Sequence, residues 1–280
     1  MADPLVSTDY LASRLGAADL SVVDATWYMP AEQRLGRDDY LKGHIPGAVF
    51  FDIDEIADKT VDLPHMLPTA EAFEKAAGAL GLSPDHEVVV YDAQGLFSAP
   101  RVWWTLRIMG FRRVFVLDGG LPRWIAEGRP LETGAAEPKP KTFTAAFDPA
   151  LVSSLEHVRA VVEDRSRQIV DARPAARFTA EAPEPRAGLR GGHMPGASCL
   201  PFSALLGPDG RLKPADELAK AFAEAGIDLD QPIITTCGSG VAASGVALAL
   251  ARLGHDRAAV YDGSWTEWGA RGDTPVATGA

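Results

Sequence analysis

Short apolar runs alternate with longer segments of helical periodicity along the whole 280-residue chain. Apolar runs rich in β-branched residues predict strands at 20–25, 87–92, 113–117, 168–171, 233–236 and 258–261. Apolar positions at helical spacing predict helices at 69–80, 99–109, 214–225 and 241–253. Short strands that alternate with helices indicate an α/β fold, with a mainly parallel sheet flanked by helices.

The same motifs occur twice, in the same order. The repeated pairs are VVDA at 22–25 with IVDA at 169–172, GHIPGA at 43–48 with GHMPGA at 192–197, and LDGG at 117–120 with YDGS at 261–264. A nearly constant offset between such pairs indicates a tandem duplication. We therefore predict two α/β domains, at 1–131 and 151–280, joined by a linker at 132–150 that is rich in Pro, Ala and Thr.

Cys237 ends an apolar run, and Gly238 and Gly240 follow it before a long helical segment. A loop of this kind, between a strand and a helix, directs backbone N–H groups and the positive end of the helix dipole toward the sulfur. Such a setting favours the nucleophilic thiolate and can also bind an anion. A buried structural cysteine is the alternative interpretation. Asp92 occupies the aligned position of the first repeat, so the first domain is expected to be inactive.

These features resemble the two-domain rhodanese-like sulfurtransferases over essentially the whole chain. The motifs that carry the resemblance are CGSGV at 237–241, DAR at 171–173 followed by RF at 177–178 and EPR at 184–186, and SAPRVWW at 98–104. The cysteine loop is similar to that of the 3-mercaptopyruvate branch, because the thiosulfate branch usually has Arg and Lys directly after the cysteine. Ala242 departs from the family, which commonly has Thr there.

Four arginines, Arg173, Arg177, Arg186 and Arg190, lie in the segment that the second repeat inserts before its GHMPGA motif. Because a guanidinium binds a carboxylate through two parallel hydrogen bonds, this segment is a candidate clamp for an α-keto acid; a solvated loop with surface ion pairs is the alternative. The resemblance assigns the substrate carboxylate to Arg177 and Arg186. Arg173 and Arg190 are weaker candidates.

The resemblance also implies roles for the loop and for the first domain. Gly238, Gly240 and Val241 would contact the substrate. Asp54 and His65 match positions that have been proposed to form a relay with a loop serine, here Ser239. A carboxylate can fix the tautomer of an imidazole, which can then accept a hydroxyl proton. An interdomain ion pair is the alternative for Asp54 and His65.

Residues that both repeats share are expected to be structural, because the first repeat lacks the nucleophile. They are the pairs His44 and His193, Asp24 and Asp171, Asp118 and Asp262, and Trp124 and Trp268. We expect Cys199 to be a small buried filler, with a regulatory disulfide as the alternative.

Composition excludes several classes of protein. The chain has 27 Lys and Arg against 38 Asp and Glu, which argues against a nucleic-acid partner. We expect no membrane span, no secretion signal and a cytoplasmic location. Two cysteines and six histidines show no zinc-type spacing, so we expect no metal and no cofactor. A phosphatase that uses a Cys-x5-Arg loop is also disfavoured, because Ala243 occupies the position that would need arginine.

The resemblance thus implies that Cys237 takes sulfur from 3-mercaptopyruvate as a persulfide and releases pyruvate. A thiol acceptor, such as a thioredoxin-like protein or a small thiol, or cyanide would then remove the sulfur. Thiosulfate:cyanide transfer on the same cysteine is the first alternative. A non-catalytic rhodanese-type module that binds partners is the second.

Overall fold

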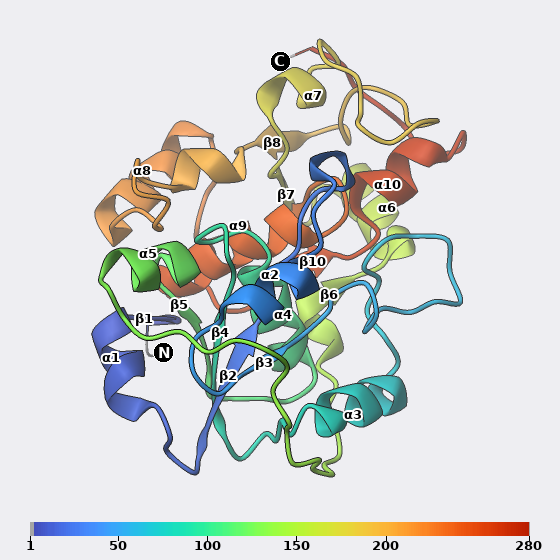
Figure 1. Ribbon diagram of the computed structural model, residues 1–280. Coiled ribbons are helices and arrows are strands. Elements are labelled where there is room, and N and C mark those ends of the chain that lie inside the picture. Colours follow the sequence, from blue (N-terminus) through green and yellow to red (C-terminus); the bar gives the residue numbers. More distant parts are fainter. Residues whose placement is uncertain (1–2, 280) are drawn as a thin grey trace.

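The computed structural model describes residues 3–279 and contains two five-stranded parallel sheets (Figure 1). The first sheet consists, in spatial order, of β1 (Leu5–Val6), β5 (Val114–Leu117), β4 (Glu87–Tyr91), β2 (Leu20–Asp24) and β3 (Ala48–Phe50). The second consists of β6 (Val152–Ser153), β10 (Ala259–Tyr261), β9 (Ile233–Thr236), β7 (Gln168–Asp171) and β8 (Ala197–Cys199). Both sheets have the same strand order, which confirms the predicted tandem α/β fold.

The helices flank the two sheets. They are α1 (Thr8–Arg14), α2 (Gly36–Lys42), α3 (Ala70–Ala79), α4 (Ala99–Ile108), α5 (Gly120–Ala126), α6 (Leu155–Asp164), α7 (Ala175–Phe178), α8 (Ala215–Glu224), α9 (Val241–Arg252) and α10 (Ser264–Ala270). Short 3₁₀ turns lie at η1 (Pro30–Glu32), η2 (Pro149–Leu151) and η3 (Phe202–Leu205). Across residues 3–279, every helix is too short or too polar to cross a membrane.

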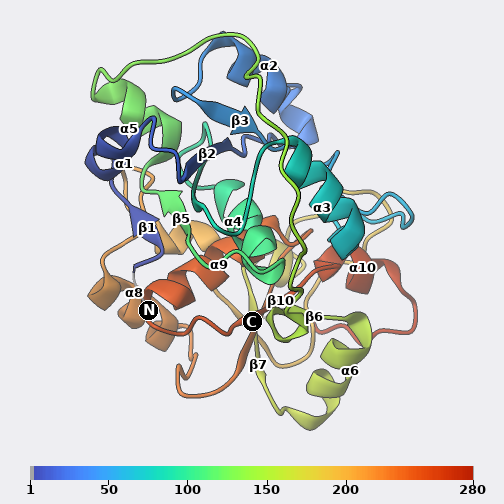
Figure 2. The ribbon, with the colours of Figure 1, turned by 90° about the horizontal axis from the view of Figure 1, so that it is seen from below.

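The central strands are buried on both faces, as a parallel sheet covered by helices requires. All five residues of β4 are buried, and Val89 and Val90 pair with Val22 and Val23 of β2. Two helices, α4 and α9, are also buried almost all round, which their apolar composition predicts. They pack against each other between the two sheets (Figure 2). One apolar core therefore spans both halves, and side chains of the first half can reach the loops of the second.

The segment between the two sheets is extended, as its composition predicts. It is fixed along the first half by backbone hydrogen bonds: Lys141 N–H donates to the carbonyl of Gly78 at 2.9 Å, and Ala146 N–H donates to Met109 at 3.1 Å. The ring of Phe143 packs edge to face on Phe111, with centroids 5.3 Å apart. The segment thus contributes to the core of the first half.

Candidate active site

Cys237 follows β9, the central strand of the second sheet, and precedes the first turn of α9. Ligands of parallel α/β sheets bind at this carboxyl end of the strands. The residue is 4% exposed. Its backbone is fixed by the start of α10: Cys237 N–H donates to Ser264 Oγ at 3.3 Å, and its carbonyl accepts from Trp265 N–H at 2.9 Å. The sulfur is therefore held on a rigid support.

In the loop after Cys237, backbone carbonyls accept hydrogen bonds, whereas backbone N–H groups have no acceptor. The carbonyl of Gly238 accepts hydrogen bonds from Thr266 N–H and Oγ1, at 2.9 and 2.7 Å. The carbonyl of Gly240 accepts from Ser244 Oγ at 2.8 Å, and Gly240 itself has a left-handed φ of +81°. Within residues 3–279, the N–H groups of 238–243 have no hydrogen-bond acceptor. These free groups, at the positive end of α9, form a cradle of a kind that can bind an anion.

The equivalent cradle of the first half contains its own anion. The carboxylate of Asp92, which follows β4, is fully buried. It accepts hydrogen bonds from the backbone N–H groups of Gln94, Phe97, Ser98 and Ala99, at 2.9, 2.7, 2.9 and 2.8 Å. Burial raises the pKa of Asp92, while these N–H groups act in the opposite direction. In the first repeat the loop N–H groups are therefore occupied by a carboxyl group of the chain itself.

Arg177 lies against the cysteine loop and is fixed by a chain of alternating charges. A Cβ added at Gly238 would be 3.3 Å from Arg177 Nη2, so glycine gives the guanidinium room to approach. Arg177 pairs with Glu184, which also binds Arg173 at 2.7 Å. Arg173 in turn pairs with Asp171, at the end of β7, at 2.6 Å. Glu184 uses Nε and Nη2 of Arg177, which leaves Nη1 without a protein partner within the described chain.

Arg186 is half-buried and forms no ion pair or hydrogen bond with any residue of 3–279. Burial lowers the pKa of Arg186, because it penalises the charged form. The neighbouring Arg177 cation lowers the pKa of Arg186 further, and nearby Asp54 raises it. A partly desolvated cation with free donors is well suited to bind a carboxylate.

Asp54 and His65, both from the first half, form a pair beside this site. His65 Nδ1 lies 2.7 Å from Asp54 Oδ1, and Trp27 Nε1 donates to Asp54 Oδ2 at 2.7 Å. Burial raises the pKa of Asp54, but the contacts with His65 and Trp27 outweigh it and leave the pKa lowered. His65 is buried; its Nδ1 is close to Asp54 without the geometry of a hydrogen bond, and its Nε2 has no partner within the described residues. Because His65 Nε2 is unpaired, no hydrogen bond joins it to the hydroxyl of Ser239, a residue that is also buried.

The other arginine and cysteine candidates lie in structural positions. Arg190 donates to the carbonyls of Gly269 and Thr274, at 3.1 and 2.9 Å. Cys199, on β8, is half-buried, which differs from the expected small buried filler. Burial raises the pKa of Cys199 to about 11, so its thiol is protonated near neutral pH.

Three further residues at the site were not singled out from the sequence. Glu184 and Arg101 occurred there only inside motifs, and Trp27 was not considered. The sequence could have indicated Arg101, because it is a charged residue within a helix that is apolar on nearly every side. Glu184 lies between two arginines of the inserted segment, where a carboxylate is needed to separate their charges.

Comparisons with known proteins agree with this architecture. The model of the rhodanese-like domain matches residues 7–127 and again 154–271. The 3-mercaptopyruvate sulfurtransferase of Escherichia coli (strain K12) is 47% identical, over 97% of this chain and 96% of that protein. The human 3-mercaptopyruvate sulfurtransferase is 44% identical, over 94% and 91%. A mitochondrial thiosulfate/3-mercaptopyruvate sulfurtransferase of Arabidopsis thaliana is 46% identical, over 98% and 78%.

The fold is similar to a solved structure as well. The crystal structure of SseA from Escherichia coli, described as a 3-mercaptopyruvate sulfotransferase with the rhodanese fold, superimposes with a TM-score of 0.86. It is 45% identical, and the match covers 93% of this chain and 98% of that one. The rhodanese-like domain matches the chain twice, the identities extend over nearly its whole length, and its two sheets have the same strand order. The chain therefore belongs to the rhodanese family and carries two rhodanese-like domains in tandem.

Proposed function

We propose that this protein transfers sulfur from 3-mercaptopyruvate to an acceptor through a persulfide on Cys237. The observation that carries the proposal is the contrast between the two repeats. The first loop encloses the carboxylate of Asp92, whereas the second presents free N–H groups around a thiol. Two arginines near that thiol supply positive charge and hydrogen-bond donors for an anionic substrate. The relatives named as 3-mercaptopyruvate sulfurtransferases support the choice of donor.

The substrate carboxylate binds to Arg186 and to the free Nη1 of Arg177. Arg186 can offer a bidentate contact, because no side chain of residues 3–279 occupies its donors. Arg177 is oriented by Glu184 and approaches the loop at Gly238. Binding by both arginines would orient the donor sulfur toward Cys237, which converts an encounter into a reaction between fixed partners.

Sulfur transfer then requires one bond to form and one to break. The Cys237 thiolate attacks the sulfur of 3-mercaptopyruvate and forms the S–S bond of the persulfide. The C3–S bond breaks, and its electron pair remains on C3 as the enolate of pyruvate. The N–H groups of 238–243 stabilise negative charge on the transferred sulfur, as preorganised dipoles do.

The proton that the donor thiol brings must reach C3 of the enolate to give pyruvate. Ser239 lies in the loop and is the group assigned to this transfer. The lowered pKa keeps Asp54 ionised near neutral pH, and its carboxylate, 2.7 Å from Nδ1, would hold the proton of His65 on that nitrogen. Ser239 Oγ, brought within reach of His65 Nε2 when the donor binds, passes the thiol proton to that nitrogen and then returns it to C3 of the enolate.

A thiol acceptor completes the cycle. Its thiolate attacks the outer sulfur of the Cys237 persulfide, the S–S bond breaks, and the Cys237 thiolate leaves. A small thiol, a thioredoxin-like protein or cyanide would serve as acceptor. We place the reaction in the cytoplasm, where thiols are kept reduced, although the Arabidopsis relative is named as mitochondrial.

The test is a comparison of donors in one buffer with cyanide as acceptor. We expect kcat/KM for 3-mercaptopyruvate to exceed that for thiosulfate by at least about tenfold, the equivalent of one charge-assisted hydrogen bond. The reason is that thiosulfate has no carboxylate for the two arginines to bind. Faster turnover of thiosulfate would support the alternative donor, and no transfer from either would support a binding module.

A further inference from the structure

One charged side chain from the first half lies in the interface that faces the cysteine loop. Arg101 is on α4 and is only 2% exposed. Its guanidinium packs over the ring of Trp104, 4.5 Å from the centroid. Burial of a guanidinium costs free energy that its hydrogen bonds and ion pairs must offset, so its partners indicate what it holds in place.

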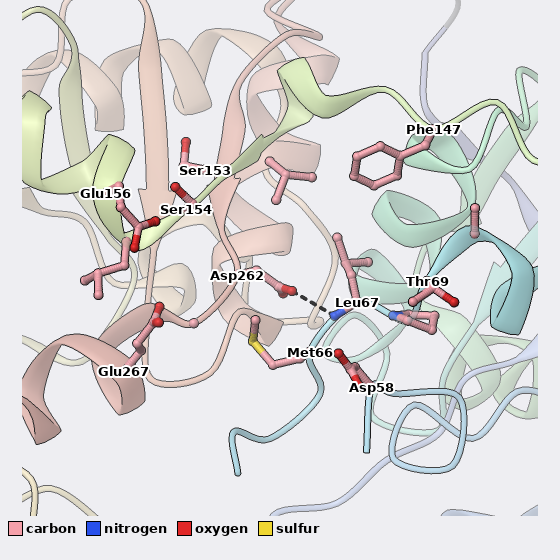
Figure 3. Close-up of a pocket in the computed structure, with 15 residues that line it drawn as sticks. Asp58, Met66, Leu67, Thr69, Phe147, Ser153, Ser154, Glu156, Asp262 and Glu267 are labelled. Atoms are coloured by element: carbon pink, nitrogen blue, oxygen red, sulfur yellow. Dashed lines mark hydrogen bonds between the residues drawn. The ribbon is translucent and has the colours of Figure 1, made fainter. Parts of the chain in front are cut away.

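The Nη2 group of Arg101 holds the segment that carries His65. It donates to the carbonyl of His65 and to Asp262 Oδ1, the latter at 2.6 Å. The second oxygen of Asp262 accepts from Leu67 N–H at 2.8 Å, as Figure 3 shows. Arg101 and Asp262 therefore bind both ends of segment 65–67. His65 has a left-handed φ of 61°, a conformation that non-glycine residues adopt only when their surroundings impose it.

The Nη1 group of the same guanidinium lies against the cysteine loop. A Cβ added at Gly240 would be 2.5 Å from Arg101 Nη1 and 3.2 Å from the carbonyl oxygen of Asp262. Nη1 is buried and has no hydrogen-bond partner within residues 3–279. One planar group thus touches the His65 segment on one side and the backbone of the Cys237 loop on the other.

The first repeat has no such arrangement, although it has an aspartate at the equivalent position. Asp118 lies 4.0 Å from Arg123 and 3.7 Å from Arg211, and its Oδ1 is buried without a partner within the described chain. The close pair that Arg101 of the first half forms with Asp262 of the second is therefore not repeated at Asp118, although sequence symmetry predicted only a structural role for Asp262.

We propose that Arg101 is a positioning residue for sulfur transfer. It sets the separation between the Asp54–His65 pair and the loop of Cys237 and Ser239. The inference rests on the proposed relay, because it assigns Arg101 an effect on the proton transfer and none on binding of the donor carboxylate. A misplacement of about 1 Å in a preorganised site can lower a rate by about a hundredfold.

The test compares Arg101→Lys with Arg107→Lys. Arg107 is a matched control on the same helix: it packs over Trp103 at 4.7 Å and faces Asp256 of the second half at 3.9 Å. We expect Arg101→Lys to lower kcat for 3-mercaptopyruvate by about tenfold with KM within about twofold, since lysine keeps the charge but cannot bridge both segments. We expect Arg107→Lys to leave kcat unchanged and to lower the melting temperature by a similar amount.

A double-mutant cycle with His65→Ala separates positioning from stability. We expect His65→Ala to lower kcat and Arg101→Lys to add little further loss in that background. Additive losses, an unchanged kcat in Arg101→Lys, or a rise in KM alone would overturn the inference while the relay stands. A wild-type kcat in His65→Ala would contradict the relay itself. If Arg101→Lys does not fold, Asp262→Asn removes the same ion pair, keeps an acceptor for Leu67 N–H, and is expected to give the same loss of kcat.

Discussion

Cys237→Ser is expected to reduce sulfur transfer from every donor to background. A serine hydroxyl is not ionised near neutral pH, and its oxygen cannot carry the transferred sulfur as a persulfide does. The backbone of the loop should persist, because Ser264 and Trp265 hold residue 237 through its main chain. Pyruvate release and thiocyanate formation, measured together, check the result.

Cys199→Ser is the matched control for this substitution. Cys199 is half-buried, and its raised pKa of about 11 leaves little thiolate near neutral pH. We expect this variant to keep the wild-type rate. Residual transfer in Cys237→Ser together with loss of transfer in Cys199→Ser would mean that the wrong thiol has been assigned.

The second large effect is expected at Arg186. Replacing it with Ala should lower kcat/KM for 3-mercaptopyruvate by about ten- to a hundredfold, equivalent to about 1.5–3 kcal/mol for a charge-assisted hydrogen bond. Since Arg186 has no protein partner within residues 3–279, the loss should fall on activity and leave the free energy of unfolding nearly unchanged. Arg186→Lys should restore the activity only in part, because the charge remains and the planar fork does not.

Arg177→Ala provides an informative comparison. We expect a similar loss of kcat/KM, but also a loss of stability, because Glu184 is buried and would keep only its contact with Arg173. Steady-state kinetics and urea unfolding of both variants measure the two effects separately. If Arg177→Ala and Arg186→Ala both retain full activity with 3-mercaptopyruvate, the carboxylate clamp is wrong even if Cys237 is the nucleophile.

The fold was predictable from the sequence because its signals are local and are repeated. The predicted helix ranges are longer than the observed helices because they include cap residues. Thr69 is the N-cap of α3, and Leu253 is the C-cap of α9. Hydrophobic periodicity does not distinguish a cap from the first or last helical residue. The edge strands β1 and β6 are only two residues long, too short to produce a period of their own.

Local sequence signals predicted the candidate site only where its residues follow one another in the chain, whereas Asp54, His65, Arg177 and Arg186 were assigned through the family resemblance. The loop from Cys237 to Val241 gives its strand, turn and helix signals within a few positions. Arg101 and Asp262 are 161 positions apart, and no local pattern relates them. Their contact depends on the packing of α4 against α9, which only the three-dimensional structure shows. The same holds for Trp27, which reaches Asp54 across a loop.

The most direct test of the central claim is the mass of the protein after a single half-reaction. The wild-type chain is treated with 3-mercaptopyruvate in the absence of any acceptor, digested and analysed by mass spectrometry. The account predicts an added mass of about 32 Da, one sulfur, on the peptide that contains Cys237 and none on the peptide that contains Cys199. Added sulfur on Cys199 alone, or pyruvate release that leaves Cys237 unmodified, would contradict it.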